Sequence, residues 1–446
     1  MNLNELSLTE VLEGIKKRNF SPKEVFGACQ KRIKDIDDKI KAFITIAPEI
    51  ENAIPFALKD NFCTTKVLTT ASSNILRNYF PTYNATVYQK LINANFGLLG
   101  KTNMDSFAHG SSTETSDFFV THNPWNLDHL PGGSSGGSAA AVMADETIFA
   151  IGSETAGSIR QPSAWCGVIG LKPTYGRVSR YGVIAMGSSL DCPGPITKTV
   201  ADAEIVYRII AGKDPLDATT VDIPLTPAKI INFKNIKIGV AKEYLAAAEE
   251  PVRKKILEAI EVFRKLGCKI IDISLFDPKY AISVYTILQR SEVSSNLARY
   301  DGIRYGFDRS YFNKENKRRI MLGTYTLSAG YYDAYYLKAQ KIRTVICQDF
   351  DKAFEKVDAI IGPVSPSLAK KIGASMEDPM FGEKEDILVE PSTIAGLPAI
   401  SLPAGFITGL PVGLQIIANK WQENLILKLA EAFEAETNYY KIKPKI

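Results

Sequence analysis

Two serines and one lysine have the residue types and sequence surroundings that suggest chemistry. Ser134 lies in the string Pro-Gly-Gly-Ser-Ser-Gly-Gly-Ser, and Ser158 ends the string Gly-Ser-Glu-Thr-Ala-Gly-Ser. Lys59 ends the apolar run Ile-Pro-Phe-Ala-Leu-Lys. A lysine held among apolar groups loses its proton more readily than one in water, so it can serve as a base. The three strings together suggest a serine hydrolase that uses lysine in place of histidine.

Each string also has a plainer interpretation. The glycines around Ser134 could approach a phosphate, but the string lacks the Gly-Lys-Ser/Thr ending of a P-loop and is not G-x-G-x-x-G, so a closely packed glycine turn is favoured. The residues before Ser158 could present backbone donors to an oxyanion, or could form a polar turn between a strand and a helix. Most lysines are solvated, so Lys59 alone indicates little.

Histidine is scarce, which narrows the choice of base. The chain has three histidines, His109, His122 and His129, all in one short stretch. Their spacing matches no i, i+4 ligand pair and no cysteine lies among them, so we expect no metal site. The six cysteines are scattered without a C-x-x-C pair, as in reduced cytosolic proteins.

Composition indicates an ordinary globular protein. The 446 residues are 45% hydrophobic and 23% charged, with a net charge of +4. This balance by itself predicts neither nucleic-acid nor membrane binding. No window reaches the roughly 18–20 apolar residues of a membrane span, and the start of the chain resembles neither a signal nor a transit peptide. We therefore expect a cytoplasmic protein.

The elements that must position these residues alternate between helix and strand, which favours an α/β fold. The glycine- and serine-rich segment 131–195 contains too many apolar residues for a linker and is expected in the core. The proline-rich segment 214–229 is expected to be a surface excursion. Strands are predicted at 42–46, 54–58, 96–99, 236–241, 269–275, 359–362, 399–402 and 413–417. Helices are predicted at 6–18, 22–36, 85–94, 201–212, 252–266, 278–298, 331–356 and 422–436.

The strings around Lys59, Ser134 and Ser158 resemble the lysine, cis-serine and nucleophilic serine of the amidase signature family. The flanking strings 110–114, 171–182 and 330–336 are similar to those of its tRNA-dependent members, the A subunits of glutamyl-tRNA(Gln)/aspartyl-tRNA(Asn) amidotransferases. The resemblance runs over nearly the whole chain. It implies one amidase signature domain over 1–446, with its core motifs at about 50–200 and a mixed sheet covered by helices on both faces.

The resemblance also implies a mechanism. Ser158 would attack the side-chain amide of glutamine, passing its proton to Ser134 and then to a neutral Lys59, and the peptide before Ser134 would be cis. Water would later release the glutamyl ester. The implied oxyanion hole consists of the backbone N–H groups of Thr155, Ala156 and Gly157.

Glutamine also carries an α-carboxylate and an α-ammonium, which a selective site would bind with a guanidinium and a carboxylate. By resemblance, Arg319 binds the carboxylate, Asp386 binds the ammonium and Tyr285 lines the pocket. Arg318 or Glu385 could take the place of its neighbour.

Three departures from the family pattern bear on these roles. Ala156 stands where the family has glycine, so strain is expected if its φ is positive. Glu154 replaces an aspartate. The chain is also shortened before Ile54 and between Tyr305 and Arg319, close to the expected glutamine pocket.

The implied function is that of a glutaminase subunit, which supplies ammonia for converting Glu-tRNA(Gln) or Asp-tRNA(Asn) to Gln-tRNA(Gln) or Asn-tRNA(Asn). The implied partners are B and C subunits in a heterotrimer, with tRNA held mainly by the B subunit. ATP and Mg²⁺ would belong to the partner kinase subunit, and this chain would need no cofactor. The alternatives are a stand-alone amidase acting on another amide, and a scaffold or nucleotide-binding protein built on the same fold.

Overall fold

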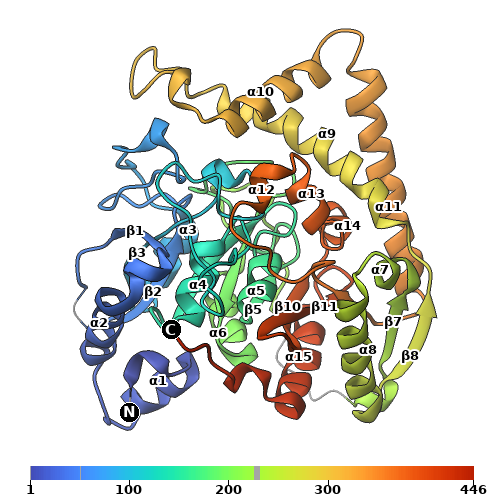
Figure 1. Ribbon diagram of the computed structural model, residues 1–446, viewed down its shortest axis with the longest axis horizontal. Coiled ribbons are helices and arrows are strands. Elements are labelled where there is room, and N and C mark those ends of the chain that lie inside the picture. Colours follow the sequence, from blue (N-terminus) through green and yellow to red (C-terminus); the bar gives the residue numbers. More distant parts are fainter. Residues whose placement is uncertain (1, 51, 226–231) are drawn as a thin grey trace.

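Eleven strands form one mixed sheet in the computed structural model, which describes all residues except 1, 51 and 226–231 (Figure 1). Strand β2 pairs in parallel with β3 and β4, strand β7 does so with β8 and β9, and the other neighbours are antiparallel. Across the sheet the strands are β1 (Phe43–Ile46), β3 (Phe96–Thr102), β2 (Ile54–Lys59), β4 (Phe149–Glu154), β6 (Cys192–Thr197), β5 (Ile169–Lys172), β10 (Ala399–Ile407), β11 (Leu410–Ala418), β9 (Ala359–Pro363), β7 (Lys237–Ala241) and β8 (Lys269–Ile273).

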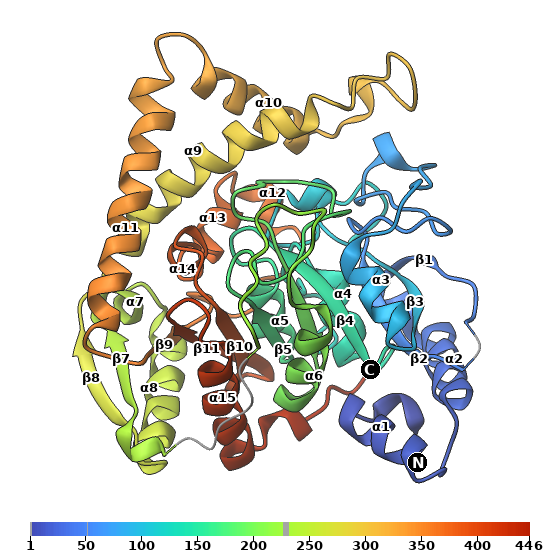
Figure 2. The ribbon, with the colours of Figure 1, turned by 180° about the vertical axis from the view of Figure 1, so that it is seen from behind.

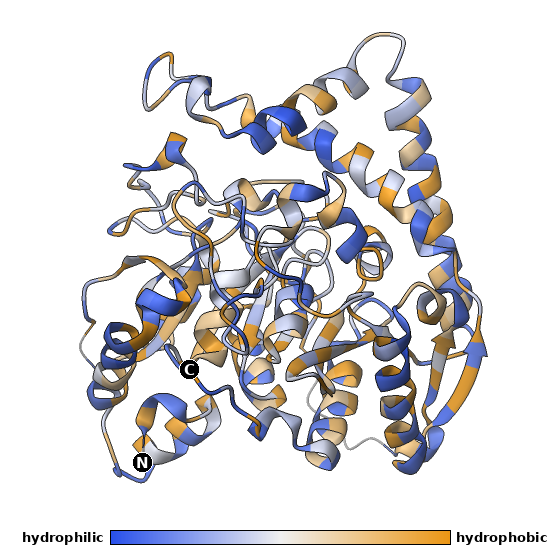
Figure 3. Cartoon of the chain, viewed as in Figure 1, coloured by the Kyte–Doolittle hydropathy of each residue, from blue (hydrophilic) through white to orange (hydrophobic). Residues whose placement is uncertain are grey.

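Helices cover both faces of this sheet, as predicted (Figures 1 and 2). Successive side chains of a strand point to opposite faces. On β11, Leu414 and Ile416 join a hydrophobic cluster with α15 (Glu423–Thr437) and α8 (Glu250–Lys265). Gln415 lies between them and instead hydrogen-bonds to the Leu388 carbonyl and to α5 (Arg160–Cys166). In Figure 3 hydrophobic residues concentrate along the strands, whereas α8 is largely hydrophilic on its outer side.

Two of the candidate catalytic residues, Lys59 and Ser158, lie at or just after the ends of two neighbouring strands. Lys59 ends β2, and Ser153 lies near the end of its parallel neighbour β4, with Leu58 paired to Ile151. The glycine-rich string leads into α4 (Gly136–Met143), in which every residue is buried. Small side chains allow this close packing, since a Cβ on Gly137 would lie 2.5 Å from the Asn103 carbonyl oxygen. The segment 131–195 is therefore core, as expected.

Three long helices project beyond one end of the strands (Figures 1 and 2). They are α9 (Pro278–Leu297), α10 (Lys314–Leu327) and α11 (Lys338–Phe354), the last preceded by a π-helical turn at Asp333–Leu337. The sequence predicted α9 and the helical stretch ending in α11 but not α10. Helix α10 buries few side chains, so its sequence lacks the apolar periodicity that predicts a helix. It packs closely against α9 at Gly323, since a Cβ on that residue would lie 1.9 Å from the Arg290 carbonyl oxygen.

The surface excursion expected at 214–229 is found in its described part, where Pro215, Leu216 and Ala218 are exposed. Asp214 and Asp217 are buried and anchor this segment, since their carboxylates receive hydrogen bonds from the preceding core segment. Asp214 accepts from Ser179 (2.5 Å) and Asp217 pairs with Arg180 (2.8 Å). Residues 226–229 lie outside the described part of the chain.

The remaining predicted strands and helices are confirmed, with ends shifted by a few residues. Strands β10 and β11 form the predicted hairpin. None of the helices in the described residues combines the length and apolarity of a membrane span. The other α-helices are α1 (Leu8–Lys16), α2 (Pro22–Ile40), α3 (Thr86–Asn93), α6 (Val200–Ile210), α7 (Lys242–Ala246), α12 (Ala374–Glu377), α13 (Phe381–Glu385) and α14 (Glu390–Ile394).

Aromatic packing beneath the catalytic strands gives a test of the fold. The ring of Phe149 lies 5.6 Å from that of Phe56 and 5.1 Å from that of Phe96, and all three side chains are buried. We expect Phe149→Ala to lower the free energy of unfolding by about 3–5 kcal/mol. Phe80, which is 56% exposed, is the control, and Phe80→Ala should change the free energy of unfolding by about 0.5 kcal/mol or less. Urea denaturation followed by circular dichroism would measure both, and equal effects would contradict this packing.

Candidate active site

Lys59 is enclosed at the end of β2 and contacts the first serine. Its side chain is fully buried. Its Nζ lies 2.7 Å from Ser134 Oγ and donates a hydrogen bond to the Ser153 carbonyl at 3.0 Å. The apolar run that precedes Lys59 in β2 provides this burial. The amine and the hydroxyl are thus within the distance that proton transfer requires.

Burial also changes the protonation of this lysine. It lowers the pKa of Lys59 from 10.5 to about 7, because a charged ammonium loses its hydration there. The carboxylates of Asp105, Asp191 and Glu154 act in the opposite direction and keep the pKa from falling further. A large fraction of Lys59 is therefore neutral near pH 7, which is the state a base needs.

The backbone brings the two serines together. The Gly133–Ser134 peptide is cis, as the family resemblance implies. The N–H of Ser135 donates to the carbonyl of Ser158 (3.2 Å), so the two strings are directly joined. Gly133 packs against the carboxylate of Asp105, where a Cβ would lie 2.2 Å from an oxygen. Asp105 in turn accepts the N–H groups of the loop that follows, including that of Thr113 (2.9 Å).

The loop before Ser158 has three backbone N–H groups that make no hydrogen bond within the described part of the chain, those of Thr155, Ala156 and Gly157. Such groups are available to hold an oxyanion. The Thr155 hydroxyl donates to Asp191 (2.7 Å), which fixes the start of the loop. Ala156 is not among the residues with positive φ, so the strain considered for this departure from glycine does not arise.

The carboxylate of Glu154 stabilises the same loop through hydrogen bonds and an ion pair. Its carboxylate accepts the N–H groups of Ile159 and Arg160 (3.0 Å each) and pairs with the Arg160 guanidinium at 2.6 Å. Arg160 also donates to Gln415 (2.7 Å) and to the Val389 carbonyl (3.0 Å). The glutamate that replaces an aspartate is thus accommodated, and its ion pair connects the serine loop to the C-terminal part of the chain.

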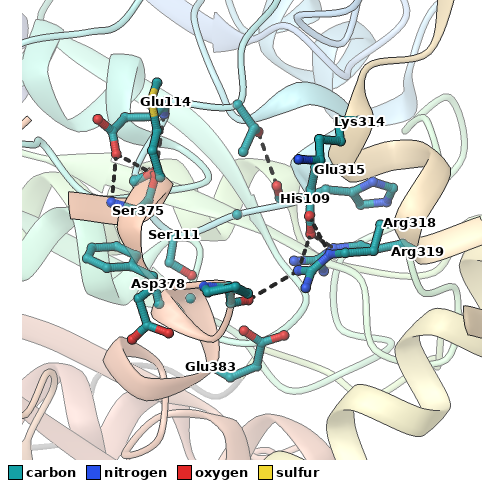
Figure 4. Close-up of a pocket in the computed structure, with 17 residues that line it drawn as sticks. His109, Ser111, Glu114, Lys314, Glu315, Arg318, Arg319, Ser375, Asp378 and Glu383 are labelled. Carbon is teal, nitrogen blue, oxygen red and sulfur yellow. Dashed lines mark hydrogen bonds and ion pairs between the residues drawn. The ribbon is translucent and has the colours of Figure 1, made fainter. Parts of the chain in front are cut away.

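A small inner cavity lies over Ser158, and the structure brings all three expected substrate-binding residues to it. Its lining includes Ser158, Tyr285, Arg319 and Asp386. The cavity has room for about one water molecule, roughly 10 Å³. Gly110, Ser111, Arg319, Gly382 and Glu383 also line a larger cleft of about 400 Å³, so the inner cavity lies next to a path toward solvent (Figure 4).

The two alternatives that the sequence left open are separated by this geometry. Arg318 and Arg319 both contact Glu315 (Figure 4), but only Arg319 lines the inner cavity, whereas Arg318 lines the outer cleft alone. Glu385 points elsewhere and accepts hydrogen bonds from Ser365 and Ser367. Arg319 and Asp386 are therefore the members of each pair that face Ser158.

Asp386 is a buried carboxyl group beside the serine loop. One oxygen accepts from the Ser111 hydroxyl at 2.6 Å, and the other has no hydrogen-bond partner among the described residues. Burial raises the pKa of Asp386 well above its ordinary value. A Cβ on Gly157 would lie 2.5 Å from its free oxygen, so a glycine is needed there for the two segments to meet.

Several groups near the cavity were not identified from the sequence. Arg290 lies in α9, where the sequence pattern predicted only a helix, and Glu383 and Glu390 lie in α13 and α14, which were not predicted. His109 lies in the outer cleft and bonds Asn316 through Nδ1 (2.6 Å), while burial lowers its pKa to about 3. The described residues contain no group of three His, Cys, Asp or Glu side chains that could hold a metal ion.

Comparisons with known proteins agree with this arrangement. The chain is similar to the A subunit of glutamyl-tRNA(Gln) amidotransferase from Thermodesulfovibrio yellowstonii, with 50% identity over 484 residues, and to that from Geobacillus kaustophilus, with 47% over 483 residues; both alignments cover all of each chain. The crystal structure of the Thermotoga maritima counterpart matches with a TM-score of 0.86 and 42% identity, covering 97% of this chain and 95% of that one. The Amidase family model matches residues 24–427, and the chain therefore belongs to the amidase family.

Proposed function

We propose that the chain is the glutaminase subunit of a tRNA-dependent amidotransferase, which hydrolyses glutamine and supplies ammonia to a partner. The observation that carries this proposal is the contact between a buried Lys59 and Ser134, next to a cavity that Ser158, Arg319 and Asp386 line together. The relatives named as A subunits of glutamyl-tRNA(Gln) amidotransferase support it over the full length of the chain.

The first half of the reaction forms an ester. Ser158 Oγ attacks the side-chain amide carbon of glutamine, and its proton passes through the Ser134 hydroxyl to the neutral amine of Lys59. The negative charge that develops on the amide oxygen is held by the N–H groups before Ser158. The C–N bond then breaks, and the proton returns from Lys59 to the leaving nitrogen, so ammonia departs.

The second half releases glutamate. A water molecule attacks the glutamyl ester, again losing its proton toward Lys59, and the C–O bond to Ser158 breaks as the serine regains a proton. The net reaction is glutamine plus water to glutamate plus ammonia. Lys59 ends neutral and ready for another cycle. No step requires a metal or an organic cofactor.

The substrate is recognised through its two α-groups. The planar guanidinium of Arg319 binds the carboxylate, Asp386 binds the ammonium, and Tyr285 forms part of the wall. This pair of charges favours an amino acid over a simple aliphatic or aryl amide. Because the inner cavity has room for only about one water molecule, side chains that line it must move outward when glutamine enters.

We infer that the ammonia is used by another chain of the same complex. In this proposal B and C subunits complete a heterotrimer in the cytoplasm, and the B subunit holds most of the tRNA. ATP and Mg²⁺ act on the partner kinase subunit that activates the misacylated tRNA. The names of the relatives favour Glu-tRNA(Gln) as the acceptor, with Asp-tRNA(Asn) as the alternative.

Replacing the nucleophile tests the assignment. We expect Ser158→Ala to lower glutamine hydrolysis by about 10⁴-fold or more, since the ester can no longer form. Complex formation with the partner subunits should be unchanged. Ser401→Ala is the control, because Ser401 is a buried serine on β10 whose hydroxyl has no partner among the described residues. Full activity of Ser158→Ala would contradict the proposal, and hydrolysis of simple amides with none of glutamine would favour a stand-alone amidase.

The pKa of Lys59 gives a second prediction. With a pKa of about 7, the amine becomes protonated as the pH falls and can no longer accept the serine proton. We expect kcat/KM for glutamine to decrease about tenfold per pH unit below about pH 6 and to level off above about pH 8. Initial rates over a range of pH in which circular dichroism is constant would measure this. A flat profile from acid to alkali would exclude Lys59 as the base.

The two neighbouring arginines give a matched comparison. Arg319→Lys should raise KM for glutamine by about tenfold or more, because an ammonium cannot replace the bidentate contact with the carboxylate. Arg318→Lys should change KM by less than about twofold. With 4-aminobutanamide, which has no carboxylate, the two variants should behave alike in steady-state assays of ammonia release. If Arg318→Lys had the larger effect on glutamine, the roles would have to be exchanged.

A further inference from the structure

The side chains of Glu383, Asp386 and Glu390 lie one after another beside the inner cavity, and we call these three carboxyl groups the carboxyl ridge. Glu383 lies in α13, Asp386 follows that helix, and Glu390 begins α14. Backbone hydrogen bonds connect the positions of these groups. The Asp386 N–H donates to the Gly382 carbonyl, and the Glu390 N–H donates to the Asp386 carbonyl (3.0 Å each). Spacings of three and four residues place the side chains on the same side of such a turn. All three line the cavity that contains Ser158.

The three groups differ in what they contact. Glu383 forms an ion pair with Arg290, which is also buried. One carboxyl oxygen of Asp386 accepts a hydrogen bond from the Ser111 hydroxyl, and the other has no hydrogen-bond partner among the described residues. Glu390 is fully buried, and neither of its oxygens has a hydrogen-bond partner among the described residues. A buried carboxyl group without hydrogen bonds destabilises a fold, so its presence at a cavity requires an explanation.

The cations beside the ridge already have carboxylate partners. Arg319 is paired with Glu315 at 2.6 Å, and Arg290 with Glu383. This leaves Asp386 and Glu390 as the carboxyl groups of the cavity with no ion-pair partner among the described residues. Burial raises the pKa of Glu390 well above its ordinary value, and the negative charges of Asp386 and Glu383 raise it further. The free site thus contains two acceptor groups suited to one additional cation.

We propose that Glu390 is a second receptor for the α-ammonium of the substrate and thereby a specificity-determining residue. The inference rests on the proposed glutaminase function. An alkylammonium has three N–H donors, and Ser111 occupies one oxygen of Asp386, so a second carboxyl group is needed to engage more of those donors. A leucine or glutamine of similar size would fill the same space without the cost of a buried charge. Recognition of a cation explains why an acid is present.

The test compares two substrates that differ only in the ammonium. Glutamine carries it, and 5-amino-5-oxopentanoate has the same amide and carboxylate without it. In the complex purified with its partner subunits, Glu390→Gln should lower kcat/KM for glutamine by about 10- to 100-fold. The same variant should change kcat/KM for 5-amino-5-oxopentanoate by less than about twofold. The loss for glutamine should appear mainly in KM, because the contact exists before and during the reaction.

Two further variants keep the test decisive. Glu385→Gln is the matched control, since Glu385 is a buried glutamate of the same segment that faces Ser365 and Ser367, and it should leave the ratio of the two substrates unchanged. Glu390→Asp keeps a carboxyl group and should retain more of the preference for glutamine than Glu390→Gln does. If Glu390→Gln does not fold, as judged by circular dichroism, Glu390→Asp becomes the test. A decrease in its kcat/KM for glutamine, with kcat/KM for 5-amino-5-oxopentanoate unchanged, then supports the inference.

Other outcomes would overturn it. Equal losses on both substrates would mean that Glu390 acts through the structure of the site, and no loss on either would mean that it does not bind the ammonium. Either result would leave the glutaminase assignment intact, since the wild-type complex would still hydrolyse glutamine. Failure of the wild-type complex to hydrolyse glutamine would instead overturn the proposed function itself.

Discussion

The burial of one amine is the constraint on which the rest of the site depends. Lys59 can act as a base only if its ammonium form is destabilised, and full enclosure at the end of β2 provides this. Enclosure in turn requires neighbours that satisfy the amine without restoring its charge. The Ser134 hydroxyl and the Ser153 carbonyl do so, because β2 and β4 run in parallel and end side by side. The position of two strands thus sets the chemistry of one nitrogen.

A second buried group connects the chemistry to substrate recognition. Arg160 pairs with Glu154 under the serine loop and also donates to the Val389 carbonyl and the Ser392 hydroxyl. Those acceptors lie in the segment that carries Asp386 and Glu390. Because all of these contacts are buried, the distance from Ser158 to the carboxyl ridge is fixed by a network rather than by one flexible side chain. Ser158 and the carboxyl groups of the proposed receptor are therefore positioned together.

The sequence predicts the part of this arrangement that local patterns encode. Apolar runs identify β2 and seven other strands but not the central strands β4, β5 and β6, and the two serine strings identify Ser134 and Ser158. Helix α10 could not be predicted because it packs through a glycine and a few polar groups instead of an apolar stripe. The Arg160 network joins residues up to 255 positions apart, and Glu390 precedes Pro391 at the start of a helix, which is an ordinary capping pattern. Their roles depend on tertiary contacts that one sequence does not reveal.

The same low-dielectric interior acts in opposite directions on the two kinds of group. It lowers the pKa of Lys59 to about 7 and so favours the free amine, and it disfavours ionisation of Asp386 and Glu390. The unliganded site therefore carries less charge than its residue types indicate. A zwitterionic substrate brings an ammonium to this site, and the ammonium stabilises the ionised forms of the carboxyl groups on the ridge. Under the proposed function, the ammonium of glutamine thus favours the ionised forms of Asp386 and Glu390, while burial keeps a large fraction of Lys59 neutral.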